Sequence, residues 1–549
     1  MRIFDTYVQK LKYKVLTELA RQTWVGNDAF SVFNDIANQV VKKGEPTMSC
    51  CIYKDRAIVA ERIRIALGGK KEDHNVIQVI DIACDECPVA GHVVTDLCRG
   101  CVAHACVDAC KLGAITVDSH QKAEIDKSKC VECGKCAKSC PYSAIANFKR
   151  PCERACKVDA ISMAPDGVAQ IDSEKCIECG ACVYKCPFGA TLDVSSITDI
   201  IKTIVDSDNN KNYHVHAIVA PAIAGQFQYA KAGQIISAIR ELGFYAVEEV
   251  ALGADIVAYK EAQELQEKGF LTSSCCPAFV KYIKMKFPQL AEHIYHNLSP
   301  MAETGKLIKE QDPAAKIVFI GPCTAKKGEV RKPEVHQYVD YVMTFEELQA
   351  MIDSKDIAVD QLPETELDTA TYYGRVFART GGLSEAVTEA VREQKAAAEA
   401  AKADAAKADA LDGAGTSGAV ASGEAGTNSG KPALGDGAVS GASGKPAPGD
   451  GAVSGASGKP APGDGACDGD SADSKPFVFD PIVCDGIDSC KTALLRASKG
   501  LLPNNFIEGM VCTDGCIGGA ACLSHGNADK RAIDNYGKKA THKEIRDVL

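Results

Sequence analysis

The chain has 549 residues, of which 46% are hydrophobic and 25% are charged, so it is long enough for about two to four globular domains. Its net charge of −11 argues against a nucleic-acid-binding surface, because neutralising phosphates requires clustered Lys and Arg. The mean hydropathy is −0.09 and no apolar run reaches about 18 residues, which argues against a membrane span. Residues 1–22 scatter Lys and Arg among apolar positions without a signal-peptide core. A cytoplasmic protein is expected.

The first 75 residues predict helices. Tyr7, Leu11, Val15 and Leu19 recur at the spacing of one helical face. We therefore expect an N-terminal helical region over residues 1–75.

Cysteine dominates the next segment, 76–195. The chain has 27 cysteines, many of them in short CxxC-type spacings, and in a reducing compartment such cysteines are metal ligands rather than disulfide partners. Two runs have the spacing C-x2-C-x2-C-x3-C-P that is typical of 4Fe–4S clusters. A zinc site explains neither the third cysteine nor the final proline of each run. The two runs are Cys130, Cys133, Cys136 and Cys140, and Cys176, Cys179, Cys182 and Cys186.

Looser cysteine groups precede both runs, as in a two-cluster ferredoxin repeat, where the fourth cysteine of each run binds the other cluster. This alternation predicts three sets of ligands: Cys98, Cys101, Cys106 with Cys140; Cys130, Cys133, Cys136 with Cys110; and Cys176, Cys179, Cys182 with Cys156. The remaining Cys152 and Cys186 would complete a fourth cluster with Cys84 and Cys87, unless the last two are ordinary buried or zinc-binding thiols. A ferredoxin-like domain with three or four 4Fe–4S clusters follows, and a row of such clusters implies transfer of single electrons.

From residue 196 onward, β-like runs alternate with helical stretches, which predicts an α/β domain with a partly parallel sheet. Residues 396–475 interrupt this domain, and there the segment GDGAVSGASGKPAP occurs twice, at 435–448 and 449–462. Such a composition buries too little apolar surface to order itself, so a disordered insert is expected. Its alanine-rich start is compatible with an extension of the preceding helix. The domain is therefore split into 196–395 and 476–549.

Three motifs of this domain, TSSCCPAF at 272–279, GPCTAKKGE at 321–329 and EGMVCTDGC at 508–516, resemble the signature loops of FeFe hydrogenases. The likeness extends to VAPAIAG at 219–225 and ARTGGLSEAV at 378–387. Phe279 stands where many members carry Trp, and Gly321 where they carry Met. With its cysteine-rich leader, the chain resembles the divergent group B branch.

The resemblance implies an active-site H-cluster, a 4Fe–4S cubane joined to a two-iron subcluster with CO, cyanide and dithiolate ligands. It implies that the cubane is held by Cys276, Cys323, Cys512 and Cys516, and that Cys516 bridges to the two irons. Lys326 is then a charged donor toward the cyanide ligands, and Cys275 the proton carrier.

A proton relay needs ionisable groups beyond that cysteine. Glu261 and Glu264 lie three residues apart on an expected helix, and Glu329 follows the second motif. Each is also compatible with a plain solvated helix face. Met510 either packs on the cluster or belongs to the core.

The expected function is the interconversion of protons and electrons with H2. Ferredoxin is the expected electron partner, and maturation proteins the builders of the two-iron unit. A hydrogen or redox sensor on the same fold is an alternative. So is a hydrogenase-related electron carrier or cluster-assembly protein without the two-iron unit.

Overall fold

The computed structural model describes residues 4–28, 31–44, 51–70, 73–85, 87, 90–413 and 477–549. Two compact units are distinguished, residues 1–397 with 479–549, and residues 398–478. Helix α19 runs over Gly382–Gly413, so the alanine-rich start of the expected insert is helical. The rest of the expected disordered insert, including its repeat, lies outside the described residues. None of the helices described here is both long enough and apolar enough to cross a bilayer.

The N-terminal region forms helices α1 (Tyr7–Trp24), α2 (Phe33–Val40) and α3 (Ile52–Ala66). Helix α1 begins at a cap, because the hydroxyl of Thr6 accepts a hydrogen bond from the backbone N–H of Gln9 at 3.1 Å. Leu11, Val15 and Leu19 of the expected face are buried, while Tyr7 is exposed.

The cysteine-rich segment folds into two similar units of short helices and antiparallel strand pairs. In the first unit the pairs are β2 with β5 and β3 with β4, and in the second they are β1 with β8 and β6 with β7. The strands are β1 (Ile77–Val79), β2 (Gly91–Val94), β3 (Ile115–Val117), β4 (Ala123–Ile125), β5 (Ile145–Phe148), β6 (Ile161–Met163), β7 (Ala169–Ile171) and β8 (Thr191–Asp193). The helices are α4 (Asp81–Cys84), α5 (Ala105–Asp108), α6 (Lys135–Ser139), α7 (Pro151–Ala155) and α8 (Ala181–Lys185).

The rest of the chain is an α/β domain with two sheets, and all their strand pairs are parallel. One sheet has the order β10-β9-β12-β13 and the other β11-β15-β14. The strands are β9 (Val215–Val219), β10 (Ala246–Glu249), β11 (Leu271–Thr272), β12 (Lys316–Gly321), β13 (Tyr341–Thr344), β14 (Pro481–Asp485) and β15 (Phe506–Met510). The predicted fold class is confirmed, and these sheets are wholly rather than partly parallel.

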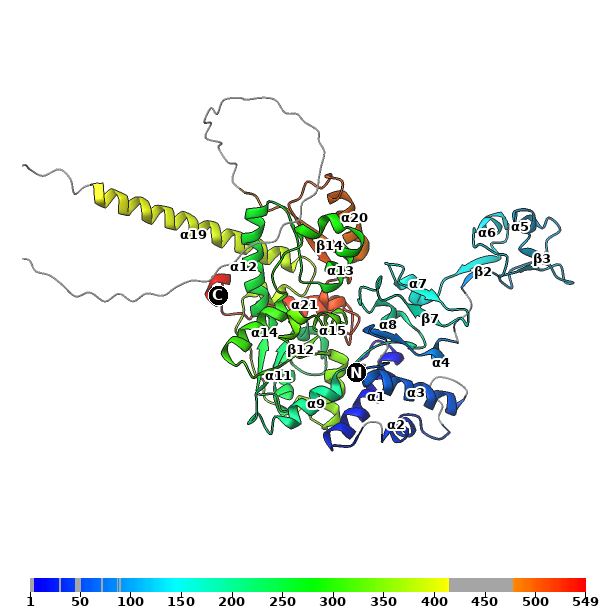
Figure 1. Ribbon diagram of the computed structural model, residues 1–549, viewed down its shortest axis with the longest axis horizontal. Helices are drawn as coiled ribbons and strands as arrows, with labels where there is room; N and C mark the ends of the chain where they lie inside the picture. Colours follow the sequence, from blue (N-terminus) through cyan, green and yellow to red (C-terminus); the bar gives the residue numbers. More distant parts are fainter. Residues whose placement is uncertain are drawn as a thin grey trace, which may run out of the picture. The chain divides into compact units, whose positions relative to one another are not determined.

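Helices surround both sheets. They are α9 (Ile197–Asp206), α10 (Ile223–Gln226), α11 (Ala232–Glu241), α12 (Val250–Lys268), α13 (Pro277–Lys286), α14 (Pro300–Gln311), α15 (Ala325–Glu329), α16 (Pro333–His336), α17 (Phe345–Ser354), α18 (Tyr372–Val376), α19, α20 (Ile487–Ala497) and α21 (Asn527–Gly537). Figure 1 shows α20 and β14, which follow the insert, beside α13. Strand β15 pairs between β11 and β14, so the segment after the insert completes this sheet.

The N-terminal helices share the core of the α/β domain. Helix α1 packs on α9 and α17, and Val15 and Leu19 belong to the same buried cluster as Ile200 and Leu348. Burial of one helical face against these neighbours stabilises α1 more than its intrinsic propensity does.

A buried ion network joins α1, the end of β8 and α15. The Nζ atom of Lys12 lies 2.5 Å from Oδ1 of Asp193, whose Oδ2 lies 2.7 Å from Nζ of Lys327. Lys327 also pairs with Glu347 at 2.8 Å. Burial opposes the charge of Asp193, yet the two ammonium groups hold the pKa of that carboxyl well below its usual range. The network anchors α15 through Lys327. It thereby also holds the backbone of the adjacent residue, Lys326.

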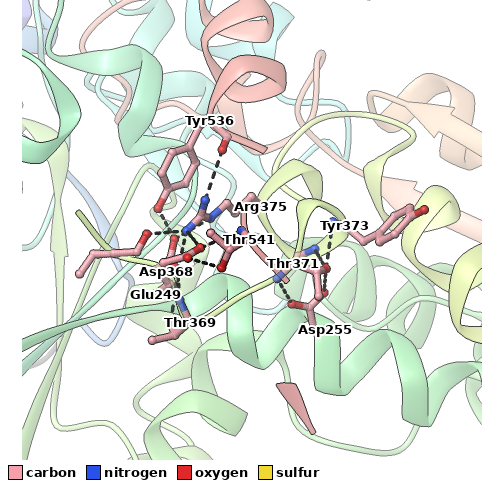
Figure 2. Close-up of polar contacts among 11 residues, drawn as sticks. Glu249, Asp255, Asp368, Thr369, Thr371, Tyr373, Arg375, Tyr536 and Thr541 are labelled. Carbon is pink, nitrogen blue, oxygen red and sulfur yellow. Dashed lines mark hydrogen bonds and ion pairs between the residues drawn. The ribbon is translucent and has the colours of Figure 1, made fainter. Parts of the chain in front are cut away.

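A second buried network ties α18 to β10 and α21 (Figure 2). The guanidinium of Arg375 donates to both carboxylate oxygens of Glu249, at 2.9 and 3.2 Å, and stacks on the ring of Tyr536. The hydroxyl of Tyr536 also donates to Glu249. Beside this group, the backbone N–H of Thr371 donates to Asp255 at 2.8 Å. Burial raises the pKa of Asp255 to about 7.

Candidate functional site

Four cysteines from three strand ends line one cavity. Cys276 precedes α13 beyond the end of β11, Cys323 lies between β12 and α15, and Cys512 and Cys516 follow β15. Active sites of parallel sheets form at the carboxyl ends of the strands, which is where all four lie. The cavity has a volume of about 100 Å³ and is also lined by Cys275, Lys326 and Met510.

This donor set fits a cubane. The thiols of Cys276, Cys323, Cys512 and Cys516 are near enough to act electrostatically on one another. Four soft thiolates among apolar Ala, Pro, Phe and Met side chains are the ligand set of a 4Fe–4S cluster.

The charged groups predicted from the second motif lie together at this cavity. The ammonium of Lys326 lies 2.5 Å from Oε2 of Glu329 and donates to the hydroxyl of Ser299 at 2.9 Å. Burial opposes the charge of Lys326, but Glu329 raises its pKa above the ordinary value. Glu329 is buried and so is not part of a solvated helix face. Ser299 could not be predicted as part of the site, because a Ser before Pro at the start of α14 indicates only a helix cap.

Helix α12 carries the two other carboxylates. Glu261 is buried, and its Oε1 has no hydrogen-bond partner among the described residues. Burial, with Glu264 and Glu508 nearby, raises the pKa of Glu261 well above its ordinary value. Burial and Glu261 likewise raise the pKa of the Cys275 thiol. The Glu261 carboxyl and the Cys275 thiol thus lie near enough to act electrostatically on one another.

Glu264 lies one turn further along α12 and contacts partly exposed groups. Its Oε1 accepts from Lys268 at 2.7 Å and lies 2.9 Å from Nδ1 of His296. Although burial works against the charge, these two partners hold the pKa of Glu264 below its ordinary value. Thus Cys275, Glu261 and Glu264 lead from the cavity toward the surface.

Two departures from the family pattern are accommodated by neighbouring side chains. Phe279 is fully buried and packs on Gly509, where a Cβ atom would lie 2.1 Å from its ring. At Gly321 a Cβ atom would lie 2.6 Å from the ring of Phe319, so a methionine there requires Phe319 to move. Met510 is buried.

The thiols of the first ferredoxin-like unit lie in two neighbouring sets. One small cavity is lined by Cys98, Cys101, Cys106 and Cys140. Cys136 interacts electrostatically with Cys130 and Cys133. Its apolar cluster contains Cys110 but also Cys98 and Cys106, so the fourth ligand of this set stays a prediction.

The second unit has two groups. Cys156, Cys176, Cys179 and Cys182 interact with one another, and Cys179 also interacts with Cys276 of the cavity. The other group consists of Cys84, Cys87, Cys152 and Cys186. Its Cys84 sulfur accepts from the guanidinium of Arg150 at 3.6 Å and from the backbone N–H of Ala169 at 3.4 Å. Charged and backbone donors of this kind stabilise thiolates.

The fold and the cysteine groups define an iron–sulfur redox protein. The family described as "Iron only hydrogenase large subunit, C-terminal domain" matches residues 213–433 and 466–520, about half of the chain. A 4Fe–4S dicluster domain matches residues 97–144 and 150–190. The chain belongs to the iron-only hydrogenase family and carries a ferredoxin-like segment that binds 4Fe–4S clusters.

Curated relatives include two kinds of protein. Iron hydrogenase 1 of Clostridium pasteurianum is 29% identical over 308 residues, which cover 50% of this chain and 52% of that protein. The periplasmic [Fe] hydrogenase large subunit of Nitratidesulfovibrio vulgaris is 30% identical over 178 residues, 28% of this chain and 42% of that one. The cytosolic Fe-S cluster assembly factor NAR1 of Kluyveromyces lactis is 37% identical over 95 residues, 17% of this chain and 20% of that one. The matched part of the chain thus spans about half, or less, of the length of each of these relatives.

Among solved structures, a variant of the [FeFe]-hydrogenase HydA1 from Chlamydomonas reinhardtii is similar, with a TM-score of 0.43 and 17% identity. The match covers 64% of this chain and 92% of that one.

Proposed function

We propose that the protein is an FeFe hydrogenase, which interconverts two protons and two electrons with H2. The observation that carries this proposal is one cavity that combines four thiols with Cys275 and Lys326, beside the buried Glu261. A plain electron carrier needs the four thiols but neither the fifth cysteine nor the lysine.

In this proposal the residues that would hold the H-cluster are Cys276, Cys323, Cys512 and Cys516, with Cys516 as the cysteine shared with the two-iron unit. When bound, the H-cluster supplies the redox chemistry. The ammonium of Lys326, kept charged by Glu329, donates to the anionic cyanide ligands and orients them. Cys275 carries a proton on its sulfur.

The proposed relay continues along α12. Glu261 exchanges a proton with Cys275 and with Glu264, whose partners Lys268 and His296 are partly or largely exposed. Because burial raises the pKa of the Glu261 carboxyl, this group takes up a proton more readily than an exposed carboxyl does and is suited to pass it on.

Electrons would travel through the four cysteine groups of the ferredoxin-like segment. The interaction of Cys179 with Cys276 supports the group of Cys156, Cys176, Cys179 and Cys182 as the last step before the active site. We propose a ferredoxin or a similar one-electron carrier as the partner, and dedicated maturation proteins as the source of the two-iron unit.

Similarity to the NAR1 assembly factor favours a second candidate, a cluster-assembly protein with cubanes alone. Cys275 and Lys326 count against it, since neither is needed to hold a cubane. A hydrogen sensor would keep both residues and would differ from the enzyme in its rate of hydrogen turnover.

Anaerobic infrared spectroscopy of protein matured with the two-iron unit tests the proposal, and Cys516→Ala serves as the comparison. We expect bands of iron-bound CO and cyanide that shift under hydrogen in the native chain and are lost in the variant. Cubane iron without such bands would favour the assembly role. Shifting bands with negligible hydrogen turnover would favour the sensor.

The fourth cluster gives a prediction of its own. The double variant Cys84→Ala/Cys87→Ala removes two ligands of one cubane, so we expect iron analysis to show a loss of about four iron atoms per chain. Cys51→Ala, at an exposed cysteine outside every group, is the control and keeps its iron. An unchanged iron content in the double variant would show that Cys84 and Cys87 are ordinary thiols.

A further inference from the structure

A group of histidine and carboxylate side chains lies at the amino-terminal ends of β9 and β12. His214 precedes β9, His216 is in β9, and Asp312 follows α14 just before β12. His214 and His216 are two residues apart in an extended segment, so their side chains point to the same face of the sheet. Each of the three offers a ligand atom, and these atoms lie within 4.8 Å of one another.

The hydrogen bonds of His216 prepare one nitrogen as a ligand. Its Nδ1 lies 2.8 Å from Oε1 of Glu248 in β10, an arrangement that places the ring proton on Nδ1 and the lone pair on Nε2. That Nε2 is buried and has no hydrogen-bond partner in the described part of the chain, and 9% of the side chain is exposed. A buried nitrogen without a partner costs free energy. A carboxylate behind the ring is the usual support of a metal-binding histidine.

The two other residues complete an accessible site. His214 lies 2.7 Å from Asp312 and is stacked on the ring of Tyr245, with centroids 3.8 Å apart. Both side chains of this pair are partly exposed, so an ion and a water molecule have a path to the group. A plain His214–Asp312 ion pair would satisfy these two residues and leave Nε2 of His216 unused.

We propose that His214, His216 and Asp312 bind a divalent transition-metal ion of the zinc class, with Glu248 as the supporting carboxylate. Two imidazoles and one carboxylate suit Zn²⁺ better than Mg²⁺ or Ca²⁺, which prefer oxygen ligands alone. Ligands of tetrahedral zinc lie about 3.3 Å apart at bond lengths of about 2.0 Å. The three ligand atoms here lie within 4.8 Å of one another, so a bound ion would draw them together.

The site is separate from the iron–sulfur centres. Cys323 follows the carboxyl end of β12 and Asp312 precedes its amino end, and a strand of this length spans about 20 Å. None of the three ligands is a cysteine. The ion would join the loop before β12 to β9 and, through Glu248, to β10.

The test uses protein whose iron–sulfur clusters are fully loaded, so that zinc does not compete for their thiols. After equilibration with dilute Zn²⁺ and dialysis, we expect about one more zinc per chain in the native protein than in His216→Ala. Anomalous diffraction on both sides of the zinc edge would place that ion between His214 and Asp312. His336→Ala, at an exposed histidine of α16, is the matched control and keeps its zinc.

Two further variants keep the proposal falsifiable if His216→Ala fails to fold. Asp312→Asn, at a partly exposed position, should lose the zinc while keeping its iron. Glu248→Gln should bind zinc about 10–100-fold more weakly, because its carboxylate acts through His216. Equal zinc contents in the native protein and in the variants that keep their iron would overturn the site.

Discussion

Cys275→Ala is expected to lower hydrogen turnover by about 10²–10⁴-fold while leaving the iron content of the matured protein nearly unchanged. The thiol lines the cavity but is not one of the four cysteines proposed to hold the cubane. Its removal takes away the group that is proposed to carry a proton between the cavity and Glu261. Hydrogen evolution with a one-electron reductant, measured together with iron analysis, checks both parts.

The control for this variant is Cys51→Ala, which removes an exposed cysteine and should change neither quantity. The infrared bands of the matured Cys275→Ala protein should persist, because its cluster is still bound. A variant that kept its turnover would exclude Cys275 as the proton carrier. A variant that lost its iron would make the cysteine a structural or ligating residue.

Arg375→Met is expected to lower the free energy of unfolding by about 3–5 kcal/mol, since it leaves the buried carboxylate of Glu249 without its charged partner. The side chains of Arg375 and Glu249 are 1% and 3% exposed. Burial works against the charge of Arg375, but its hydrogen bonds to Glu249 raise its pKa, so the guanidinium stays charged. Urea unfolding of the iron-loaded protein, followed by far-UV circular dichroism, measures the loss.

Two variants separate the buried charge from general effects of substitution. Lys211→Ala breaks an exposed pair with Asp208, whose two side chains are 69% and 60% exposed, and should change stability little. Arg375→Met/Glu249→Gln should be less destabilised than Arg375→Met, because the double variant leaves no buried charge unpaired. If Arg375→Met cost no more free energy of unfolding than Lys211→Ala, the network would be dispensable for stability.

The class of the fold and the iron–sulfur runs were predictable, because both follow from the spacing of residues within short segments of the sequence. The alternation of strands and helices after residue 196 gave the α/β class, and the ferredoxin spacing of Cys130–Cys140 and Cys176–Cys186 indicated how the thiols group. Side-chain periodicity in helices and strands, and the spacing of cysteines around one cluster, are both set by the backbone over a few residues. The three cysteine motifs of the active site could be linked only through the family resemblance, since hundreds of residues separate the first from the last.

Contacts between distant segments could not be predicted. Lys12, Asp193 and Lys327 lie in three different parts of the chain. From the sequence alone, each would be predicted to be a charged side chain exposed to solvent. The apolar face of α1 is predictable from the sequence, but the helix on which it packs, α17, is not. His214 and Asp312 are likewise about 100 residues apart in the sequence, and the pattern HVH indicates only a strand.

The position of β15 between β11 and β14 also sets an order for biosynthesis. A ribosome releases Cys276 and Cys323 long before Cys512 and Cys516, because residues 414–476 must be translated in between. Until β15 has docked, the nascent domain has only two of the four thiols and an open sheet. If these four thiols hold the cubane as proposed, its stable insertion must wait until Cys516 has been translated. A protein truncated in the insert would then be unable to acquire that cluster.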